Sequence, residues 1–473
     1  MRFEDAQCRK NANQVTFFVP AGRPRPLRPR TAFARGRVLT VSRSNRKQLL
    51  VAGRLERMTQ RCEILILGSG VIGLSCAYFL AQSGREVTIL DQGTPGCGSS
   101  HGNCGTITPS HAPPLAKPGM VRQALRWMAD ADAPLYIQPR FDPALWQWLW
   151  GFARRCNWQD FHRVLRDKAS ILKSSRELMA GLIAREQIQC EFEARGHLTV
   201  FRDPFALEAF AWWPEALREV GIEVESLDGS RLRDREPALR PEVVGGFNTP
   251  GDAQLRPDLY VAELVRVVRT LGVRIESNTR ITGFARGPDG LSEVKTEQGR
   301  FAGAHTILAL GAWSPLLGRQ LGLKIPVQPG KGYSVTTSAP QQPPRVPIVC
   351  RERSVAITPW RNTYRVGSTM EFSGYDRSLN RRRIEAMVRS AGEYLIEPMG
   401  VTRIEEWYGW RPMSIDDLPM IGAAPGLRGF WLATGHGMLG MSMSASTGLL
   451  IADLVAGRKP SIDPAPYSPA RFG

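Results

Sequence analysis

One stretch, residues 62–91, constrains this chain more than any other, and it reads CEILILGSGVIGLSCAYFLAQSGREVTILD. Its apolar run at 64–67 has the length and branched side chains of a buried parallel strand. The glycine spacing G-x-G-x-x-G at 68–73, a helical pattern, a second apolar run and Asp91 follow in that order. This succession predicts a βαβ unit that binds a dinucleotide.

Each glycine of this unit has a separate physical role. Gly68 permits the tight turn after the strand, Gly70 lets the backbone approach a pyrophosphate, and Gly73 lets the helix pack closely on the strand. The helix that follows offers free N–H groups and the positive end of its dipole to the phosphates. We expect Asp91 to accept a hydrogen bond from a ribose hydroxyl.

Composition limits the class of protein. The 473 residues suffice for two or three domains. The sequence has no run of 18 apolar residues, so a spanning helix is not expected. The eight cysteines are scattered without a CxxC pair, which predicts neither a thioredoxin-like disulfide nor a zinc site and fits a reducing compartment. We therefore expect a cytoplasmic protein, with the cytoplasmic face of the inner membrane as a peripheral location.

The net charge of +18 belongs largely to one end of the chain. Residues 1–57 contain 14 Lys or Arg and only three acids, without a periodic apolar pattern. This composition predicts a disordered basic extension. An upstream translation start, with Met58 as the true start, is the favoured interpretation; a targeting peptide and a nucleic-acid arm are the alternatives. The only aromatic residues there are four phenylalanines (Phe3, Phe17, Phe18 and Phe33), too few for regular stacking between the basic ones, so no nucleic-acid partner is expected.

Three later segments extend the predicted nucleotide site. The loop at 93–105, GTPGCGSSHGNCG, is rich in small residues and can wrap the second phosphate and a ring system. The buried strand pattern at 306–310 ends in Gly311, which indicates a second contact on the same sheet. The loop at 434–440, TGHGMLG, opens a final helix whose N-terminus can stabilise negative charge.

The segment at 124–158 is rich in tryptophan. In PALWQWLWGFARRC the apolar residues fall at helical spacing, with arginines after them. Such a helix can rest on a membrane surface. Burial against the rest of the protein is the favoured interpretation.

Four ordered motifs together resemble the D-amino acid oxidase superfamily of flavoproteins, and most closely the bacterial D-amino acid dehydrogenases. The motifs are GSGVIG (68–73) with Asp91, SSHGNCGTITP (99–109), GKGYS (330–334), and the pair WRPMSIDDLPMIG (410–422) and TGHGMLGMSM (434–443). The resemblance extends over about residues 62–460. It implies an α/β fold with a discontinuous Rossmann-type FAD-binding domain and an α+β substrate domain built on an antiparallel sheet. We expect the FAD-binding domain at 58–120, 230–325 and 405–465, and the substrate domain at 121–229 and 326–404.

The resemblance also implies the cofactor contacts. Some relatives attach the flavin covalently through a histidine or cysteine. His101 is one position away from that histidine and no cysteine follows Cys350, so we predict non-covalent FAD. The residues expected to contact FAD are Gly68, Gly70, Val71, Ile72, Gly73, Asp91, Ser99, Ser100, Asn103, Gly105, Val273, Gly311, Gly435, Gly437, Met438 and Gly440.

By the same resemblance, the reaction is oxidative deamination of a D-amino acid by hydride transfer to flavin N5, with electrons passed to a quinone or respiratory-chain acceptor. Arg411 matches the arginine that binds the substrate carboxylate, for which a planar bidentate donor suits; a structural ion pair with Asp416 or Asp417 is the alternative. Tyr333 matches a position near the substrate, or is a core tyrosine. His436 tunes the flavin or serves as a turn residue.

Other functions stay open from sequence alone. An oxygen-using amine or imino-acid oxidase (glycine or sarcosine oxidase-like) and a D-hydroxyproline dehydrogenase are the nearest alternatives. A non-catalytic flavoprotein subunit for electron transfer is the other class, although the scattered cysteines form no iron–sulfur motif. His111 is a weaker pocket candidate.

Overall fold

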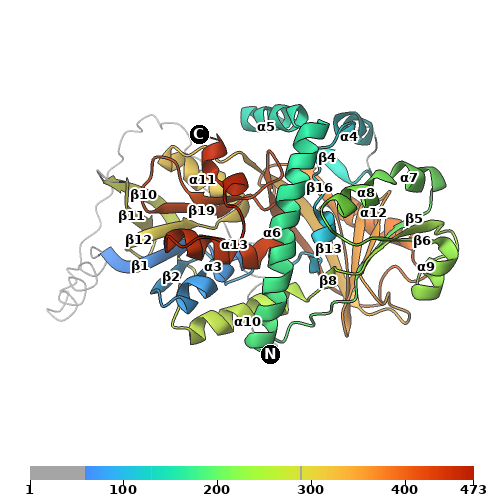
Figure 1. The fold of residues 1–473 in the computed structure, drawn as a ribbon, viewed down its shortest axis with the longest axis horizontal. Coiled ribbons are helices and arrows are strands. Elements are labelled where there is room, and N and C mark those ends of the chain that lie inside the picture. Colours follow the sequence, from blue (N-terminus) through green and yellow to red (C-terminus); the bar gives the residue numbers. More distant parts are fainter. Residues whose placement is uncertain (1–58, 129, 131, 288–289, 473) are drawn as a thin grey trace, which may run out of the picture.

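The computed structural model describes residues 59–128, 130, 132–287 and 290–472 (Figure 1). The predicted basic extension at 1–57 lies outside the described residues. The described residues contain two large sheets, one of eight strands and one of nine, and a small third sheet of two strands, β3 and β8. Figure 1 shows the two large sheets side by side, with helix α6 (Trp158–Arg185) crossing between them.

The eight-stranded sheet contains the predicted nucleotide unit. Its central strand β1 pairs in parallel with β2 and β12, so that Leu67 lies level with Leu90 and Leu308. The βαβ unit and the strand leading to Gly311 are therefore both confirmed. The strands are β1 (Thr59–Leu67), β2 (Val87–Leu90), β9 (Arg274–Glu276), β10 (Ile281–Gly287), β11 (Gly290–Thr296), β12 (Arg300–Leu308), β18 (Met420–Ala423) and β19 (Phe430–Thr434).

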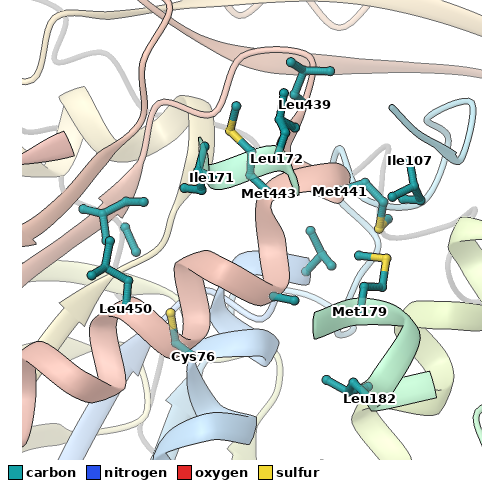
Figure 2. Close-up of a cluster of buried hydrophobic side chains, with 14 of the residues drawn as sticks. Cys76, Ile107, Ile171, Leu172, Met179, Leu182, Leu439, Met441, Met443 and Leu450 are labelled. Atoms are coloured by element: carbon teal, nitrogen blue, oxygen red, sulfur yellow. The ribbon is translucent and has the colours of Figure 1, made fainter. Parts of the chain in front are cut away.

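Three helices cover one face of this sheet: α3 (Val71–Gln82), α10 (Pro257–Thr270) and α13 (Gly440–Val455). Alternate residues of β1 point to opposite faces, so Ile64 and Ile66 pack under these helices while Leu65 and Leu67 belong to a second core. At Gly448 a Cβ atom would lie 2.5 Å from the Ser75 carbonyl oxygen, so α13 approaches α3 closely only with glycine there. Figure 2 shows the junction of α13 with α6, filled by Met179, Met441 and Met443 among others.

The nine-stranded sheet is mostly antiparallel, with parallel pairs only at β14–β5 and β16–β4. Helix α12 (Arg381–Gly392) packs on the face that carries Val335 and Val366. The strands are β4 (Leu135–Ile137), β5 (His197–Phe201), β6 (Glu225–Asp228), β7 (Gly245–Thr249), β13 (Val327–Ser338), β14 (Ile348–Cys350), β15 (Val355–Pro359), β16 (Thr363–Phe372) and β17 (Arg403–Ser414).

The expected domain boundaries need correction at two strands. β7 pairs with β5 and β6, and β17 pairs with β13 along its whole length, so both belong to the nine-stranded sheet. The sequence prediction had placed them in the FAD-binding ranges 230–325 and 405–465. The sequence of a strand does not by itself determine which strand it pairs with, because pairing depends on residues distant in the chain.

The remaining elements connect the two sheets. Helix α6 begins after Asn157, whose side chain caps it by accepting from the Asp160 N–H at 2.9 Å. The other short elements are β3 (Thr106–Ile107), α4 (Met120–Met128), α5 (Pro143–Arg154), α7 (Pro204–Ala209), α8 (Trp212–Glu219), β8 (Ala253–Gln254), α9 (Gly229–Arg235) and α11 (Ser314–Gly318).

The tryptophan-rich segment is divided between burial and exposure. Trp148 of α5 is buried and donates a hydrogen bond from Nε1 to the Met413 carbonyl at 3.0 Å. Trp146 and Trp150 on the same helix are 58% and 68% exposed. Burial was the favoured interpretation, and it holds for one face of α5 only. Among the described residues, no helix combines the length and apolar character needed to cross a membrane.

Asp252 gives the folded protein a predicted pH dependence. Its buried carboxylate accepts hydrogen bonds from the Thr249 hydroxyl and from the hydroxyl and N–H of Ser110. Burial nevertheless raises its pKa from 3.8 to about 6. The folded chain therefore holds this proton more tightly than the unfolded chain does. We expect the stability to fall by roughly 3 kcal/mol as the pH rises from about 4 to above 6.

Urea unfolding of the wild type and of Asp252→Asn, followed at pH 4.5 to 7.5, measures this effect. The asparagine cannot titrate. The unfolding free energy of the wild type should therefore fall relative to that of the variant as the pH rises. Parallel pH profiles for the two proteins would show that the Asp252 carboxyl has the same pKa in the folded and unfolded states.

Candidate active site

A cavity of about 1820 Å³ lies between the two sheets. Its walls come from the ends of β1, β2 and β12, the loop at 93–105, the start of α13 and one face of the nine-stranded sheet. Pockets for single small ligands measure about 300–1,000 Å³. This cavity therefore has room for a dinucleotide cofactor together with a second small molecule.

The three glycines at the end of β1 differ in what surrounds them. A Cβ atom on Gly73 would lie 1.9 Å from the Gly68 carbonyl oxygen, and one on Gly68 (φ +105°) would lie 2.6 Å from the Ala309 oxygen. A Cβ atom on Gly70 would meet only the Ser100 hydroxyl, at 3.5 Å. Gly68 and Gly73 thus permit packing, while Gly70 leaves the backbone open toward the cavity. The N-cap residue Gly70 gives helix α3 no side-chain cap. Apart from the Val71 N–H, which donates to the Ser100 hydroxyl, the first N–H groups of the helix are available for phosphate.

Asp91 is positioned by the glycine turn itself. Its Oδ2 accepts from the Ser69 N–H (2.7 Å) and hydroxyl (2.6 Å), and its Oδ1 accepts from the Gly93 N–H (2.9 Å). Burial is the largest influence on this carboxyl and raises its pKa. Asp91 lines the cavity. Its contact with a ribose stays a prediction. The structure shows in addition that the Asp91 carboxylate stabilises the glycine turn through its hydrogen bonds to Ser69.

The serine-rich loop is fixed to both sheets. The Ser100 hydroxyl accepts from the Val71 N–H at 3.0 Å, and the Ser99 hydroxyl donates to the Trp410 carbonyl at 2.6 Å. Asn103 closes the loop on itself by accepting from the Gly105 N–H at 2.8 Å. These contacts join the start of α3 to β17 across the cavity.

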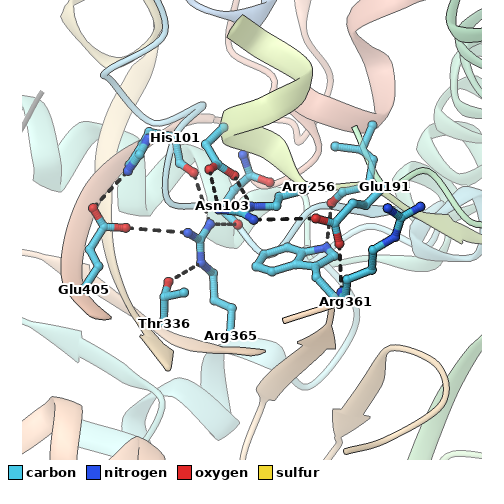
Figure 3. A network of polar contacts seen from close by, with 11 residues as sticks. His101, Asn103, Glu191, Arg256, Thr336, Arg361, Arg365 and Glu405 are labelled. Carbon is cyan, nitrogen blue, oxygen red and sulfur yellow. Dashed lines mark hydrogen bonds and ion pairs between the residues drawn. The ribbon is translucent and has the colours of Figure 1, made fainter. Parts of the chain in front are cut away.

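Arg365 of β16 anchors this loop to the nine-stranded sheet (Figure 3). The guanidinium is 3% exposed and donates to the carbonyls of His101 (3.1 Å) and Asn103 (2.8 Å). It also donates to the Thr336 hydroxyl at 2.8 Å and lies 3.6 Å from Glu405. Sequence reasoning missed Arg365, because the loop carbonyls that it binds, those of His101 and Asn103, are more than 250 residues away in the chain.

Replacing Arg365 by methionine should weaken FAD binding by roughly 10- to 100-fold, since hydrogen bonds to a charged group contribute about 1.5–3 kcal/mol. Titration of the apoprotein with FAD, followed by flavin fluorescence, measures the change. Arg361→Met is the matched control, because Arg361 is exposed and joins the same network only through its backbone N–H, which donates to Glu191. Equal FAD affinity in both variants would contradict the anchoring role.

His101 lies in the loop with its ring turned to Glu405, Nε2 to Oε1 2.9 Å. Burial raises the pKa of the neighbouring Cys104 thiol, which disfavours the thiolate. Non-covalent attachment of FAD stays a prediction. Flavin fluorescence that remains with the denatured protein on a gel would contradict it.

The start of α13 faces the cavity with Gly437, Met438 and Gly440. No side chain caps this helix, so its first N–H groups are available to a negatively charged ring edge. His436 also lines the cavity, but its ring makes a hydrogen bond within the protein. Its Nε2 lies 2.9 Å from the Thr447 hydroxyl, and because that hydroxyl donates to the Met443 carbonyl, the ring donates to Thr447.

Burial lowers the pKa of His436 to about 3, so its imidazole is neutral at physiological pH. The ring stabilises the turn into α13, which favours the structural interpretation.

Arg411 lies on β17 in the nine-stranded sheet, not on a strand of the nucleotide sheet as predicted. Its guanidinium covers Gly332, where a Cβ atom would lie 2.1 Å from Nη1. Nη1 donates to the Thr369 carbonyl at 2.7 Å. Within the described residues the guanidinium has no acid partner, although it lines the cavity and burial lowers its pKa.

The two acids that were the structural alternative are engaged elsewhere. Asp416 pairs with Arg471 at 2.7 Å, and Asp417 pairs with the buried Lys168 at 2.8 Å. Neither carboxylate binds Arg411. An arginine keeps its charge even when buried, so Arg411 is available for a carboxylate from a ligand.

The Tyr333 hydroxyl does not lie with Arg411. Successive residues of a strand point to opposite faces, and Tyr333 follows Gly332, so its side chain points toward α12. The hydroxyl donates to the buried Glu371 at 3.1 Å, and Glu371 lies 3.6 Å from Arg383. The geometry matches the core-tyrosine interpretation.

The structure brings most of the predicted cofactor residues to one cavity and leaves three out. Gly73 and Gly435 pack against neighbouring protein atoms and do not line the cavity. Val273 is buried in the hydrophobic core just before β9. The lining includes Thr279 and Arg280 after β9 instead. Ligands bind beyond the carboxyl ends of parallel strands, and that rule would have indicated the residues after β9.

Comparison with known proteins agrees with this geometry. Residues 63–454 match the model of the DAO family, described as FAD dependent oxidoreductase. The chain belongs to this family. FAD is accordingly its cofactor, and the open turn at Gly70 and the uncapped starts of α3 and α13 fit that molecule.

Individual DAO-family members are similar over nearly their full length. The D-amino acid dehydrogenase of Granulibacter bethesdensis is 33% identical over 415 residues, which cover 86% of this chain and 99% of that protein. The D-amino acid dehydrogenase of Chromohalobacter salexigens is also 33% identical, covering 87% and 99%. The solved structure of glycine oxidase from Geobacillus kaustophilus superposes with a TM-score of 0.71 at 24% identity, covering 87% and 98%.

Proposed function

We propose that this protein oxidises D-amino acids to 2-oxo acids and ammonia and passes the electrons to a quinone-type acceptor. Bound FAD would take up the hydride that leaves the substrate Cα. The protein's part is to fix the substrate so that this hydrogen points at the flavin. The imine product then hydrolyses in water.

The single observation that carries this proposal is the guanidinium of Arg411 in the cavity, which has no acid partner among the residues that the structure describes. Because Nη1 is held by the Thr369 carbonyl, the remaining N–H groups keep a fixed direction. A forked donor in a fixed direction binds a carboxylate through two parallel hydrogen bonds. The similarity to D-amino acid dehydrogenases supports the choice of enantiomer.

Lys168 and His436, two basic groups on the nucleotide side of the cavity region, are not available to take a proton from the substrate. Lys168 is paired with Asp417, and the His436 ring is neutral because burial lowers its pKa to about 3. We therefore assign no general base among them. The substrate must arrive with its amine already deprotonated or lose the ammonium proton to water, so the rate should rise with pH until the amine is deprotonated.

An exposed apolar rim supports the quinone acceptor and a contact with the membrane surface. Helix α4 has no buried residue, and Leu125 on α4 and Trp146 on α5 are both exposed and line the cavity. These two helices, which lie at the top of Figure 1, therefore form part of the cavity wall. The large exposed apolar side chains of this rim are Val121, Leu125, Met128, Phe141, Trp146 and Trp150.

Arg122, Arg126 and Arg154 lie on the same two helices. Apolar side chains with basic neighbours are typical of a surface that binds anionic lipid. Sedimentation with phosphatidylglycerol vesicles tests this contact. Trp146→Ser with Trp150→Ser should reduce binding, while Phe205→Ser, an exposed residue of α7, should not.

Anaerobic bleaching of the bound flavin by a panel of D- and L-amino acids tests the activity. Bleaching by D-amino acids alone is the expected result. Bleaching by L-amino acids or N-methylated amines instead would contradict the substrate class. Stoichiometric hydrogen peroxide during turnover in air would contradict the quinone acceptor and favour an oxidase.

A further inference from the structure

A second arginine without an acid partner faces the same cavity. Arg351 follows β14 and lines the cavity, and its backbone N–H donates to the Val200 carbonyl at 3.1 Å. In the part of the chain that the structure describes, its guanidinium makes no ion pair or hydrogen bond. The guanidinium carbon lies 4.6 Å from the centre of the Phe210 ring. This cation–π contact supplies no hydrogen-bond acceptor from another polar side chain, so the N–H donors of the group stay available for a ligand.

Arg351 and Arg411 project from the same face of the nine-stranded sheet. Strands β14 and β17 run in the same direction, because four antiparallel pairings separate them. Side chains opposite one another across paired strands share a face. One such row is Val349, Ala356, Gly367, Ser334 and Trp407. Arg351 lies two residues after Val349, and Arg411 lies four residues after Trp407. Both spacings are even, so both side chains are on the face of this row, and both are displaced from it in the same direction.

The space between the two guanidinium groups suits a short ligand. Arg411 reaches across to β16, where it holds the Thr369 carbonyl. One strand, β15, separates β16 from β14. The distance across the sheet from the Arg411 guanidinium at β16 to Arg351 at the end of β14 is therefore roughly 10 Å. Small residues, Ala356 and Gly367, lie in the wall between them. Two carboxylate–guanidinium contacts at the ends would leave room for a short aliphatic chain.

The charges near Arg351 add to its own. Lys117 stacks on the Trp212 ring at 4.5 Å and has no ion pair among the residues described. Burial lowers its pKa, and the charge of Arg351 lowers it further. The other lysine of this region, Lys168, is neutralised by Asp417 at 2.8 Å.

The acid next in the chain is occupied. The Glu352 carboxylate accepts from the Tyr394 hydroxyl at 2.7 Å and from the N–H groups of Arg202 and Asp203 at 2.8 and 3.0 Å. His111, which also lines the cavity, is neutral because burial and the neighbouring cations hold its pKa well below the usual range. This end of the cavity therefore has a positive charge that no described side chain around it neutralises.

We propose that the substrate is an amino acid whose side chain ends in a carboxylate. Arg411 binds the α-carboxylate and Arg351 binds the distal one. This inference rests on the amino acid oxidation proposed above and names the class of side chain. If the substrate had a neutral side chain, its binding would shield the Arg351 guanidinium from water without giving it a partner. Such a buried, unpaired charge destabilises the complex.

Flavin bleaching rates with D-glutamate and D-glutamine test the proposal, because the two differ in charge and hardly in volume. The wild type should prefer D-glutamate by roughly 30-fold or more in kcat/KM. D-2-aminoadipate extends the comparison to a longer chain. Arg351→Gln should remove most of the preference. The matched control is Arg353→Gln, since Arg353 lies in the same turn but pairs with Glu393 outside the cavity, and this variant should keep the preference.

Equilibrium binding gives a readout that does not depend on turnover. Glutarate has two carboxylates and no amine, and it should perturb the flavin spectrum at concentrations roughly 30-fold below those needed for butyrate. Arg351→Gln should remove this difference while retaining its FAD and its melting temperature. A wild type that oxidises D-glutamine at least as well as D-glutamate would overturn the proposal.

The two proposals fail in different ways. If neutral or basic D-amino acids bleach the flavin best, the amino acid oxidation stands and the acidic side chain is wrong. If no amino acid bleaches it and glutarate binds no better than butyrate, both are wrong. Tight glutarate binding without bleaching would support the site at Arg351 and contradict the oxidation.

Discussion

Arg411→Met should lower kcat/KM for amino acid oxidation by roughly 10²- to 10³-fold, the loss expected when one member of a buried, hydrogen-bonded charge pair is removed. The guanidinium lies over Gly332 and has only the Thr369 carbonyl as a partner among the described residues. Methionine has a similar unbranched apolar side chain but lacks the guanidinium and its N–H donors. The substrate carboxylate would then lose both its charge partner and its orientation.

Steady-state kinetics with an artificial acceptor measure this loss. Arg411→Lys should recover part of the activity through its charge but not the bidentate geometry. Arg403→Met on the same strand is the control, because Arg403 pairs with Glu385 and Glu406 at the surface and should leave kcat/KM nearly unchanged. A small effect of Arg411→Met, with FAD retained, would show that another group binds the carboxylate.

Gly73→Ala should destabilise the FAD-binding sheet by about 3 kcal/mol or more, since added volume in a tightly packed site forces the backbone to move. The new Cβ atom would lie 1.9 Å from the Gly68 carbonyl oxygen, and no side-chain rotation relieves a contact with backbone. Helix α3 would have to separate from β1. The protein should lose FAD and melt at a lower temperature.

Two glycine variants separate packing from cofactor binding. Gly181→Ala in α6 has no neighbour within 4 Å and should stabilise the helix by roughly 0.5–1 kcal/mol. Gly70→Ala meets only a side-chain hydroxyl at 3.5 Å, so the apoprotein should keep its melting temperature while FAD affinity falls. Thermal melts with and without FAD measure both effects. A Gly73→Ala protein as stable as the wild type would contradict the packing role of this glycine.

The sequence by itself determined the nucleotide-binding part of the protein. Strand, glycine turn, helix and second strand follow one another within 62–91, and each is specified by residues that are neighbours in the chain. The strand that ends before Gly311 and the glycine loop before α13 were predicted for the same reason. A short contiguous segment carries its own period and turn chemistry, so distant residues need not be known.

Only the tertiary structure decided the substrate side of the cavity. Whether Arg411 is available depends on Arg471, 55 residues from Asp416, and on Lys168, 249 residues from Asp417. Tyr333 points to α12 because the register of β13 with β16 and β17 sets its face. The same pairing places β17 in the nine-stranded sheet and Arg351 on the face of Arg411. Charge partners and strand register arise between segments far apart in the chain, and a local pattern does not contain them.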